Sequence, residues 1–321
     1  MIKQYDLVII GSGPAGLAAA IYAQRARLNT LVIEKEMMSG GQVLTTYEVD
    51  NYPGLPGISG FDLGTQMRRH ADRLETVFAE DEVERIEVEA AGEELQAAEV
   101  HAADTKGWKC VVGKKDTYLA KTVIIASGAV HRKLGVPGEK ELTGMGVSYC
   151  ATCDGAFFRK KITAVVGGGD VALEDAIFLA RMCEHVYLIH RRDTLRGARS
   201  LQEKLFSLEN VTVIWDSIVE EICGENQVES LRIRQVKTGE TSDLSVNGVF
   251  IAVGITPNSQ PYEGLVDMEQ GYICAGETGE TSVPGIYAAG DVRTKQLRQI
   301  VTAAADGANA VSSAERYLNG H

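Results

Sequence analysis

The sequence has no long apolar run and an excess of acidic over basic residues. None of its apolar stretches approaches the roughly 18 residues that a membrane-spanning helix needs. The 321 residues include 44 Asp and Glu against 32 Lys and Arg, which gives a net charge of −12. Nucleic-acid phosphates are bound by basic faces, so this balance does not favour a nucleic-acid partner. We expect a protein that binds neither a membrane nor nucleic acid.

Cysteine and proline are also scarce, with six and seven residues respectively. Four of the cysteines are scattered singly, unlike the dense disulfide framework of a small secreted domain. The chain passes at its start directly into an apolar strand and a glycine loop, without the regions of a signal peptide. These features predict a cytoplasmic protein. The length of 321 residues predicts about two domains, each with its own core.

Residues 5–34 carry a pattern typical of a dinucleotide-binding fold. An apolar strand leads into Gly11, Gly13 and Gly16, an Ala-rich helix follows, and a second strand ends at Glu34. The glycines allow a tight turn, the close approach of a pyrophosphate and close helix–strand packing. The helix N-terminus offers N–H groups to the phosphates, and Glu34 can accept a hydrogen bond from a ribose hydroxyl. The residues therefore predict a bound dinucleotide.

The same pattern recurs at residues 162–189, but it ends in basic residues. A strand, three glycines at 167–169, a helix and a second strand follow one another. Four basic side chains then stand near the position of Glu34 in the first pattern: His190, Arg191, Arg192 and Arg196. A carboxylate there would repel a 2′-phosphate, whereas guanidinium groups bind it in bidentate fashion. The second site is therefore predicted to prefer NADPH over NADH.

The predicted fold class is α/β, with two Rossmann-like dinucleotide-binding domains of three layers each (β/β/α), one inserted into the other. Apolar strands at 121–129 and 248–258 end in glycine-bearing turns and flank the second pattern, as two crossings between domains would. The first domain is predicted to comprise 1–130 and 253–321, and the inserted domain 131–252. Residues 80–118 alternate in short stretches that predict a β-meander without chemistry of its own.

Near the end of the chain, a short strand is followed by Gly290, Asp291 and a helix from about Gln299. Asp291, at the carboxyl end of that strand, could hold a sugar-like chain of hydroxyl groups. The N-terminus of the following helix could face negative charge that develops on a ring. This segment is predicted to complete the first dinucleotide site.

The two remaining cysteines form a C-x-x-C pair, Cys150 and Cys153, followed by Asp154. A structural zinc site needs four ligands, and the sequence has no second such pair and no H-x₃₋₅-H. Two inert, buried cysteines are a further alternative. A redox dithiol is favoured, because the spacing lets the sulfurs close a small ring and Asp154 can supply a proton. The pair precedes Gly167 by only 14 residues, which brings it near a hydride donor.

Five motifs, "GSGPAG", "CATCDG", "VVGGGD", "HRRD" and "YAAGDV", follow one another in this order. In order and spacing the chain resembles, essentially from end to end, the bacterial-type, low-molecular-weight thioredoxin reductases of class II of the pyridine nucleotide-disulfide oxidoreductases. The resemblance implies FAD in the first domain, NADPH in the inserted domain, a homodimer and oxidised thioredoxin as the substrate. It also implies that Cys150 attacks the thioredoxin disulfide, Cys153 faces the flavin and Asp154 is the acid–base residue.

Further site residues are carried over from the resemblance. Those implied for FAD are Gly11, Ser12, Gly13, Pro14, Ala15, Glu34, Lys35, Gly41, Gln42, Asn51, Val83, Ala126, Gly128, Gly290, Asp291, Arg298, Gln299 and Ile300. Those implied for NADPH are Gly168, Gly169, Asp170, Val171, Glu174, His190, Arg191, Arg192 and Arg196. Val171 stands where the family often has Ser or Thr, so the strictness for NADPH is left open.

The resemblance also implies a motion. The disulfide and the NADPH site lie on the same inserted domain, yet both must reach one flavin. The crossings near Ala129 and Gly254 would then be hinges for a domain rotation. Alternatives remain: a dithiol oxidase or peroxidase partner of the same build, and a non-catalytic nucleotide-sensing or metal-binding protein.

Overall fold

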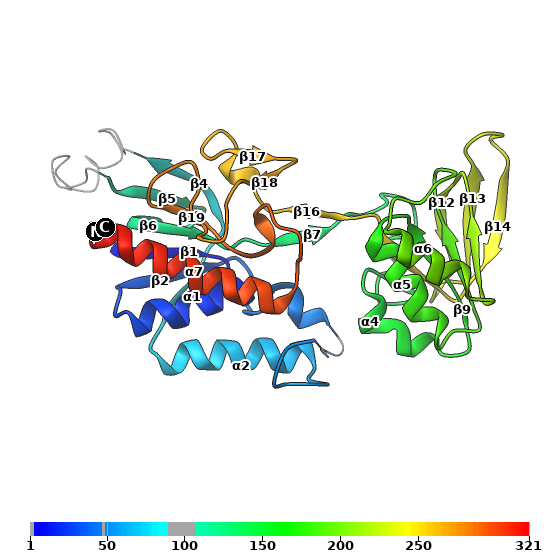
Figure 1. The fold of residues 1–321 in the computed structure, drawn as a ribbon, viewed down its shortest axis with the longest axis horizontal. Coiled ribbons are helices and arrows are strands. Elements are labelled where there is room, and N and C mark those ends of the chain that lie inside the picture. Colours follow the sequence, from blue (N-terminus) through cyan, green and yellow to red (C-terminus); the bar gives the residue numbers. More distant parts are fainter. Residues whose placement is uncertain (1–2, 47–48, 50, 89–106, 321) are drawn as a thin grey trace. The chain divides into compact units, whose positions relative to one another are not determined.

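The computed structural model describes residues 3–46, 49, 51–88 and 107–320. The chain groups into two compact units: residues 1–45, 49–130 and 257–321 form the first, and residues 46–48 and 131–256 form the second. Figure 1 follows the elements of both units along the chain. The chain leaves the first unit after Val130 and returns to it at Pro257, and the strands β7 (Ala129–His131) and β16 (Ile255–Pro257) pair at these crossings.

The first unit is built on a seven-stranded sheet with the order β3-β2-β1-β6-β5-β4, in which β19 also pairs with β6. Five of its strands run parallel: β1 (Lys3–Ile10), β2 (Thr30–Glu34), β3 (Val77–Glu80), β6 (Thr117–Ile125) and β19 (Ile286–Ala288). The antiparallel strands β4 (Val83–Val88) and β5 (Lys109–Gly113) complete it. Part of the predicted β-meander, residues 89–106, lies outside the described residues.

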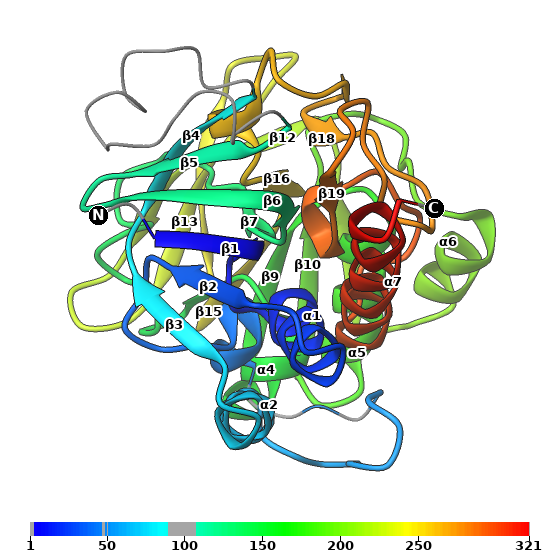
Figure 2. The same ribbon diagram turned by 90° about the vertical axis from the view of Figure 1, so that its left-hand side faces the viewer.

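Both faces of this sheet are covered, which explains the nearly continuous apolar sequence of its central strand. On β1, Leu7 and Ile9 pack with the helices α1 (Pro14–Arg25) and α7 (Ile300–Leu318). Val8 and Ile10 pack on the other face, in a cluster that includes side chains from η4 (Gln260–Tyr262) and β18 (Tyr272–Ile273), which pairs with β17 (Met268–Glu269). Figure 2 shows α1 and α7 side by side on one face of the sheet.

Small residues let these two helices approach closely. A Cβ atom added at Gly307 of α7 would lie 2.0 Å from the carbonyl oxygen of Ala15 in α1. Gly307→Ala is therefore expected to force the helices apart and to lower the free energy of unfolding by about 3 kcal/mol or more. Thermal unfolding followed by circular dichroism measures the change.

The control is Gly276→Ala, because a Cβ atom at Gly276 meets no atom within 4 Å. We expect this control to change the free energy of unfolding by about 1 kcal/mol or less. Equal stability of the two variants would contradict the close packing of α1 and α7.

The second unit repeats the plan with a five-stranded parallel sheet of order β11-β10-β9-β15-β8. Its strands are β8 (Val147–Ser148), β9 (Ile162–Gly167), β10 (His185–Ile189), β11 (Val211–Ile214) and β15 (Gly248–Ala252). One face packs on α4 (Ala151–Asp154), η3 (Gly155–Phe158), α5 (Asp170–Ala180) and α6 (Arg199–Phe206). The other face packs on the antiparallel strands β12 (Ser217–Cys223), β13 (Ser230–Gln235) and β14 (Thr241–Ser245). The predicted α/β class, with two such three-layer folds, is confirmed.

Three further elements belong to the first unit: the helix α2 (Gly60–Arg73) and the 3₁₀ turns η1 (Gly41–Thr45) and η5 (Gly290–Val292). Among the helices of the described ranges, none has the length and apolar character that would let it cross a membrane.

Candidate active site

The parallel strands of the first unit end at one edge of the sheet, and the residues predicted to hold FAD follow those ends. β1, β2, β6 and β19 pair in parallel register, so the turns after Ile10, Glu34, Ile125 and Ala288 lie along the same edge. This is where dinucleotides bind in open α/β sheets. Val83, the first residue of β4, is buried beside the end of β3.

The glycine loop forms a cradle lined by backbone. Gly11 has φ +101°, and a Cβ atom there would lie 2.5 Å from the carbonyl oxygen of Ala126. The N–H of Gly40 donates to the carbonyl of Ser12 at 2.8 Å, which brings the loop at Gly40 and Gly41 against it. No other atom lies within 4 Å of a Cβ built at Gly13 or at Gly128. The cradle therefore leaves room for phosphate groups at the N-terminus of α1, where Pro14 and Ala15 begin the helix.

Ser12, which the resemblance implies for FAD, contacts Glu34. The Ser12 side chain is fully buried, and both its N–H (2.8 Å) and its hydroxyl (2.6 Å) donate to Oε2 of Glu34. The N–H of Glu36 donates to Oε1 of the same carboxylate at 3.1 Å. Ser12 thus fixes the orientation of Glu34, the residue predicted to accept a ribose hydroxyl. Lys35 is exposed, with its Nζ 4.0 Å from Glu36.

A cavity of about 200 Å³ adjoins this carboxylate. Arg68 of α2 forms one wall, stacked 3.5 Å above the centre of the Phe78 ring, and its Nη1 donates to Ser39 Oγ at 2.8 Å. Glu34, Glu36 and Glu80 contribute acidic lining. A carboxylate-rich hollow suits sugar hydroxyls and amino groups better than phosphate, which matches the role predicted for Glu34.

Residues from three separate segments meet at the start of α7. Asn51 Nδ2 donates to Oε1 of Gln299 at 2.8 Å, although 248 positions separate the two residues. Gln299 also caps α7, and Ile300 packs against the cluster of Val43, Val49 and Leu63. The side chain of Gln42 donates to the carbonyl of Ala129. The structure therefore brings together the predicted residues of η1, the 51 region and α7.

Two polar atoms at this edge are buried and have no hydrogen-bond partner among the described residues: Oδ1 of Asp291 and Nε of Arg298. The pKa of Asp291 is raised, mainly by burial and also by the negative charge of Asp306. The positive charges of Lys295 and Arg298 act in the opposite direction. Arg298 also lies over the Tyr272 ring, at 4.1 Å from its centre. An unsatisfied acceptor and donor beside a glycine cradle fit a ligand that carries both hydroxyl groups and phosphates, so the site fits FAD.

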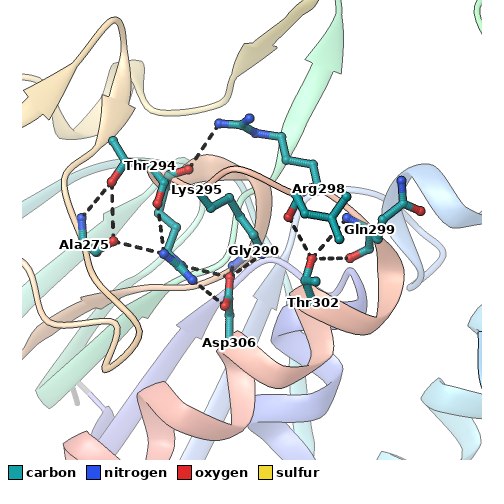
Figure 3. A network of polar contacts seen from close by, with 10 residues as sticks. Ala275, Gly290, Thr294, Lys295, Arg298, Gln299, Thr302 and Asp306 are labelled. Carbon is teal, nitrogen blue, oxygen red and sulfur yellow. Dashed lines mark hydrogen bonds and ion pairs between the residues drawn. The ribbon is translucent and has the colours of Figure 1, made fainter. Parts of the chain in front are cut away.

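A buried charge cluster surrounds Asp306 and includes the backbone of Gly290, the residue before Asp291 (Figure 3). Asp306 of α7 accepts hydrogen bonds from Arg293 Nε (2.9 Å) and Nη2 (2.6 Å), from Lys295 Nζ (2.8 Å) and from the N–H of Gly290 (2.9 Å). These bonds lower the pKa of Asp306 despite its burial. The motif analysis missed all three side chains. An aspartate among the small residues of "VTAAADGANAV" was the available signal, but sequence alone does not show that it is buried.

In the second unit the residues predicted for NADPH surround the start of α5. Gly168 and Gly169 precede the helix, and Asp170, Val171 and Glu174 lie exposed in its first turns. Gly168 is required for packing, because a Cβ atom there would lie 2.2 Å from the ring of His190. His190 is buried, its Nε2 lies 3.0 Å from the carbonyl oxygen of Thr194, and burial lowers its pKa. The structure thus gives His190 a supporting place beneath the glycine loop.

The three arginines of this region are exposed. The N–H groups of Arg196 (2.7 Å) and Gly197 (3.2 Å) donate to the carbonyl of Gly168, so the basic segment folds back onto the glycine loop. Asp170 Oδ1 accepts from the N–H of Ala198 at 2.7 Å and ties the same segment to α5. Within the described ranges, no carboxylate forms an ion pair with Arg191, Arg192 or Arg196. Their charges are available to an anionic ligand.

The C-x-x-C segment follows β8, at the same edge of the same sheet as the glycine loop. Cys150 forms a disulfide and caps α4, and its N–H donates to Ser148 Oγ at 3.1 Å. Ala151 is fully buried among side chains of α5. The side chain of Cys153 lies outside the described side chains. Asp154 ends α4 and is half-buried, and its N–H donates to the carbonyl of Cys150 at 3.2 Å.

Two dinucleotide-binding folds together with a disulfide in a C-x-x-C segment are typical of one class of protein, the flavin-dependent disulfide oxidoreductases. Comparison with known proteins gives the same class. The family model described as pyridine nucleotide-disulphide oxidoreductase matches residues 5–307, and the chain belongs to this family. The thioredoxin reductase of Bacillus subtilis is 44% identical over 318 residues, which are 98% of this chain and 95% of that protein.

Solved structures give the same result. The thioredoxin reductase of Streptococcus pyogenes is 43% identical with a TM-score of 0.78, and all of each chain is covered. The Lactococcus lactis thioredoxin reductase, solved in the FR conformation, is 40% identical with a TM-score of 0.76, with 99% of this chain and 100% of that chain covered.

Proposed function

We propose that this protein is an NADPH-dependent thioredoxin reductase. The observation that carries the proposal is that one sheet presents both a disulfide-bonded Cys150 and, beside a glycine loop, three arginines that form no ion pair with a described carboxylate. Its family uses FAD and NADPH. The first unit would hold FAD and the second NADPH, with domains at 1–130 plus 253–321 and at 131–252. We further propose a homodimer that acts in the cytoplasm, where thioredoxin disulfides are reduced.

FAD would be held by the backbone of the loop at Gly11 and Gly13, by Glu34 and by Asp291, and it supplies a two-electron relay from NADPH to the disulfide. Ser12 would keep Glu34 aimed at the ribose. In the second unit, Arg191 and Arg192 would bind the 2′-phosphate, and the α5 N-terminus the pyrophosphate.

The cysteines would then carry out thiol–disulfide exchange. Reduction breaks the Cys150–Cys153 bond and leaves two thiols. Cys150 gives its proton to Asp154, and the resulting thiolate attacks one sulfur of the thioredoxin disulfide. The bond between the two thioredoxin sulfurs breaks, and the sulfur that leaves takes the proton from Asp154. Cys153 then attacks Cys150 and restores the internal disulfide, and the proton of Cys153 passes to the second thioredoxin sulfur as it leaves. NADPH and the disulfide lie on the same unit, yet each must reach the one flavin. This requires a rotation of that unit about the crossings near Ala129 and Gly254.

The test is a turnover assay on the purified, yellow protein. We expect NADPH oxidation to depend on oxidised thioredoxin and NADH to be a much poorer donor. NADPH oxidation that requires oxygen or a peroxidase instead would identify a dithiol oxidase or a peroxidase reductase. A colourless protein without NADPH oxidation would refute the assignment. A covalent link between the units is expected to stop turnover while NADPH still binds.

A further inference from the structure

The Asp306 cluster is not explained by fold stability. The side chains of Arg293, Lys295 and Asp306 expose only 10%, 7% and 7% of their surface. Removing such charges from water carries a large desolvation cost, and well-packed apolar residues of similar volume would often be as stable or more so. The cluster also has unequal charge, with two cations on one carboxylate. Such a cluster is better accounted for by a role in holding a ligand.

The cluster fixes one loop from both ends. Oδ2 of Asp306 accepts from the N–H of Gly290 at the start of the loop and from Lys295 at its end. Arg293, in the middle, also donates to the carbonyls of Ala275 (3.0 Å) and Thr294 (2.9 Å). Figure 3 shows the bonds from Gly290 and Lys295 converging on Asp306. A loop held at three points has little freedom to turn the side chain between them.

Asp291 is that side chain. It directly follows Gly290, and its buried Oδ1 is left without a partner among the described residues. The charged groups that act on it are Lys295, Arg298 and Asp306, with Arg293 paired to Asp306. Lys295 offsets the effect of burial, because its positive charge favours the ionised form of Asp291.

We propose that Asp306, Arg293 and Lys295 are positioning residues for FAD, which hold the 290–295 loop so that Asp291 presents an oxygen in a fixed position to the sugar hydroxyls of the cofactor. This inference rests on the proposed function, because it takes FAD as the ligand. Asp306 acts through its hydrogen bonds to Gly290, Arg293 and Lys295, which hold the loop on both sides of Asp291.

The test measures FAD affinity by the flavin fluorescence released when holoprotein is diluted, at pH 6 and pH 8. Asp306→Asn leaves two buried cations without a carboxylate and tests folding as well as binding, so Lys295→Met is the sharper variant. Without Lys295 the end of the loop loses its hydrogen bond to Asp306, and a positive charge that lowers the pKa of Asp291 is removed. We expect FAD affinity to fall about tenfold, the order of one charge-assisted hydrogen bond, and to fall more at pH 6 than at pH 8. Lys121→Met, which removes an exposed ion pair with Asp6, is the matched control and should leave affinity unchanged.

The double variant Asp291→Asn/Lys295→Met separates positioning from a structural role. If Lys295 acts through Asp291, the double variant loses no more affinity than Asp291→Asn alone and has no added pH dependence. Additive losses, or a Lys295→Met variant with wild-type affinity at both pH values, would overturn the inference while leaving the proposed function intact. A wild-type protein that binds no FAD would overturn both.

Discussion

Replacement of Cys150 by serine is expected to abolish thioredoxin reduction while NADPH still bleaches the flavin. Serine cannot form the disulfide that receives electrons, nor supply the thiolate that attacks the substrate. We expect turnover with thioredoxin to fall by at least about 10³-fold, the order by which removal of a nucleophile reduces catalysis. Anaerobic stopped-flow absorbance of the flavin measures the first half-reaction separately. Cys153→Ser should likewise abolish thioredoxin reduction while NADPH still reduces the flavin.

Single cysteines elsewhere provide the control for this experiment. Cys223 is a free, half-buried cysteine in the same unit, and Cys274 is its equivalent in the other unit. Cys223→Ser and Cys274→Ser should both retain full turnover. Thioredoxin-dependent turnover that survives in Cys150→Ser, or flavin reduction that disappears with it, would rule out the proposed order of electron transfer.

The double change Arg191→Gln/Arg192→Gln is expected to remove the preference for NADPH. Both guanidinium groups are exposed, and neither is paired with a described carboxylate, so their charge is free to bind a 2′-phosphate. Charge-assisted hydrogen bonds contribute about 1.5–3 kcal/mol each, so loss of two predicts a fall of at least about 10²-fold in kcat/KM for NADPH. NADH lacks the phosphate, and its kcat/KM should change little.

The control for this pair is Arg232→Gln on β13, which removes two surface ion pairs, with Glu221 and with Asp243, in the same unit. Exposed pairs of this kind contribute about 1 kcal/mol or less each to stability, and these two lie outside the predicted site. Steady-state kinetics with each nucleotide measure the ratio of kcat/KM for NADPH to kcat/KM for NADH. A parallel loss with NADPH and NADH would show that the arginines support the loop rather than read the phosphate.

The regular part of the fold could be predicted because it depends on local patterns. The apolar run at residues 5–10, the glycine spacing and the acidic or basic residue after the second strand each follow from the geometry of a parallel strand, a tight turn and a helix. These patterns predicted the parallel strands of both sheets. The helix expected from about Gln299 begins at Ile300 with Gln299 as its cap.

The buried polar contacts could not be predicted, because they depend on which segments meet in three dimensions. Ser12 and His190 stand in motifs whose members are usually assigned to the ligand, yet one holds Glu34 and the other fills the space that Gly168 leaves. Asp306 lies 13 positions from Arg293 on a different element. No periodicity in the sequence links these residues, and their roles toward a cofactor stay predictions.

One feature of the second sheet has a kinetic consequence. β15 separates β8, which precedes Cys150, from β9, which precedes Gly168, so two strand intervals of about 5 Å lie between the redox segment and the nucleotide loop. Both are anchored to one rigid sheet, and a movement that brings one of them to a fixed point displaces the other. In the proposed reaction, electron uptake and electron delivery are then events that exclude each other in time.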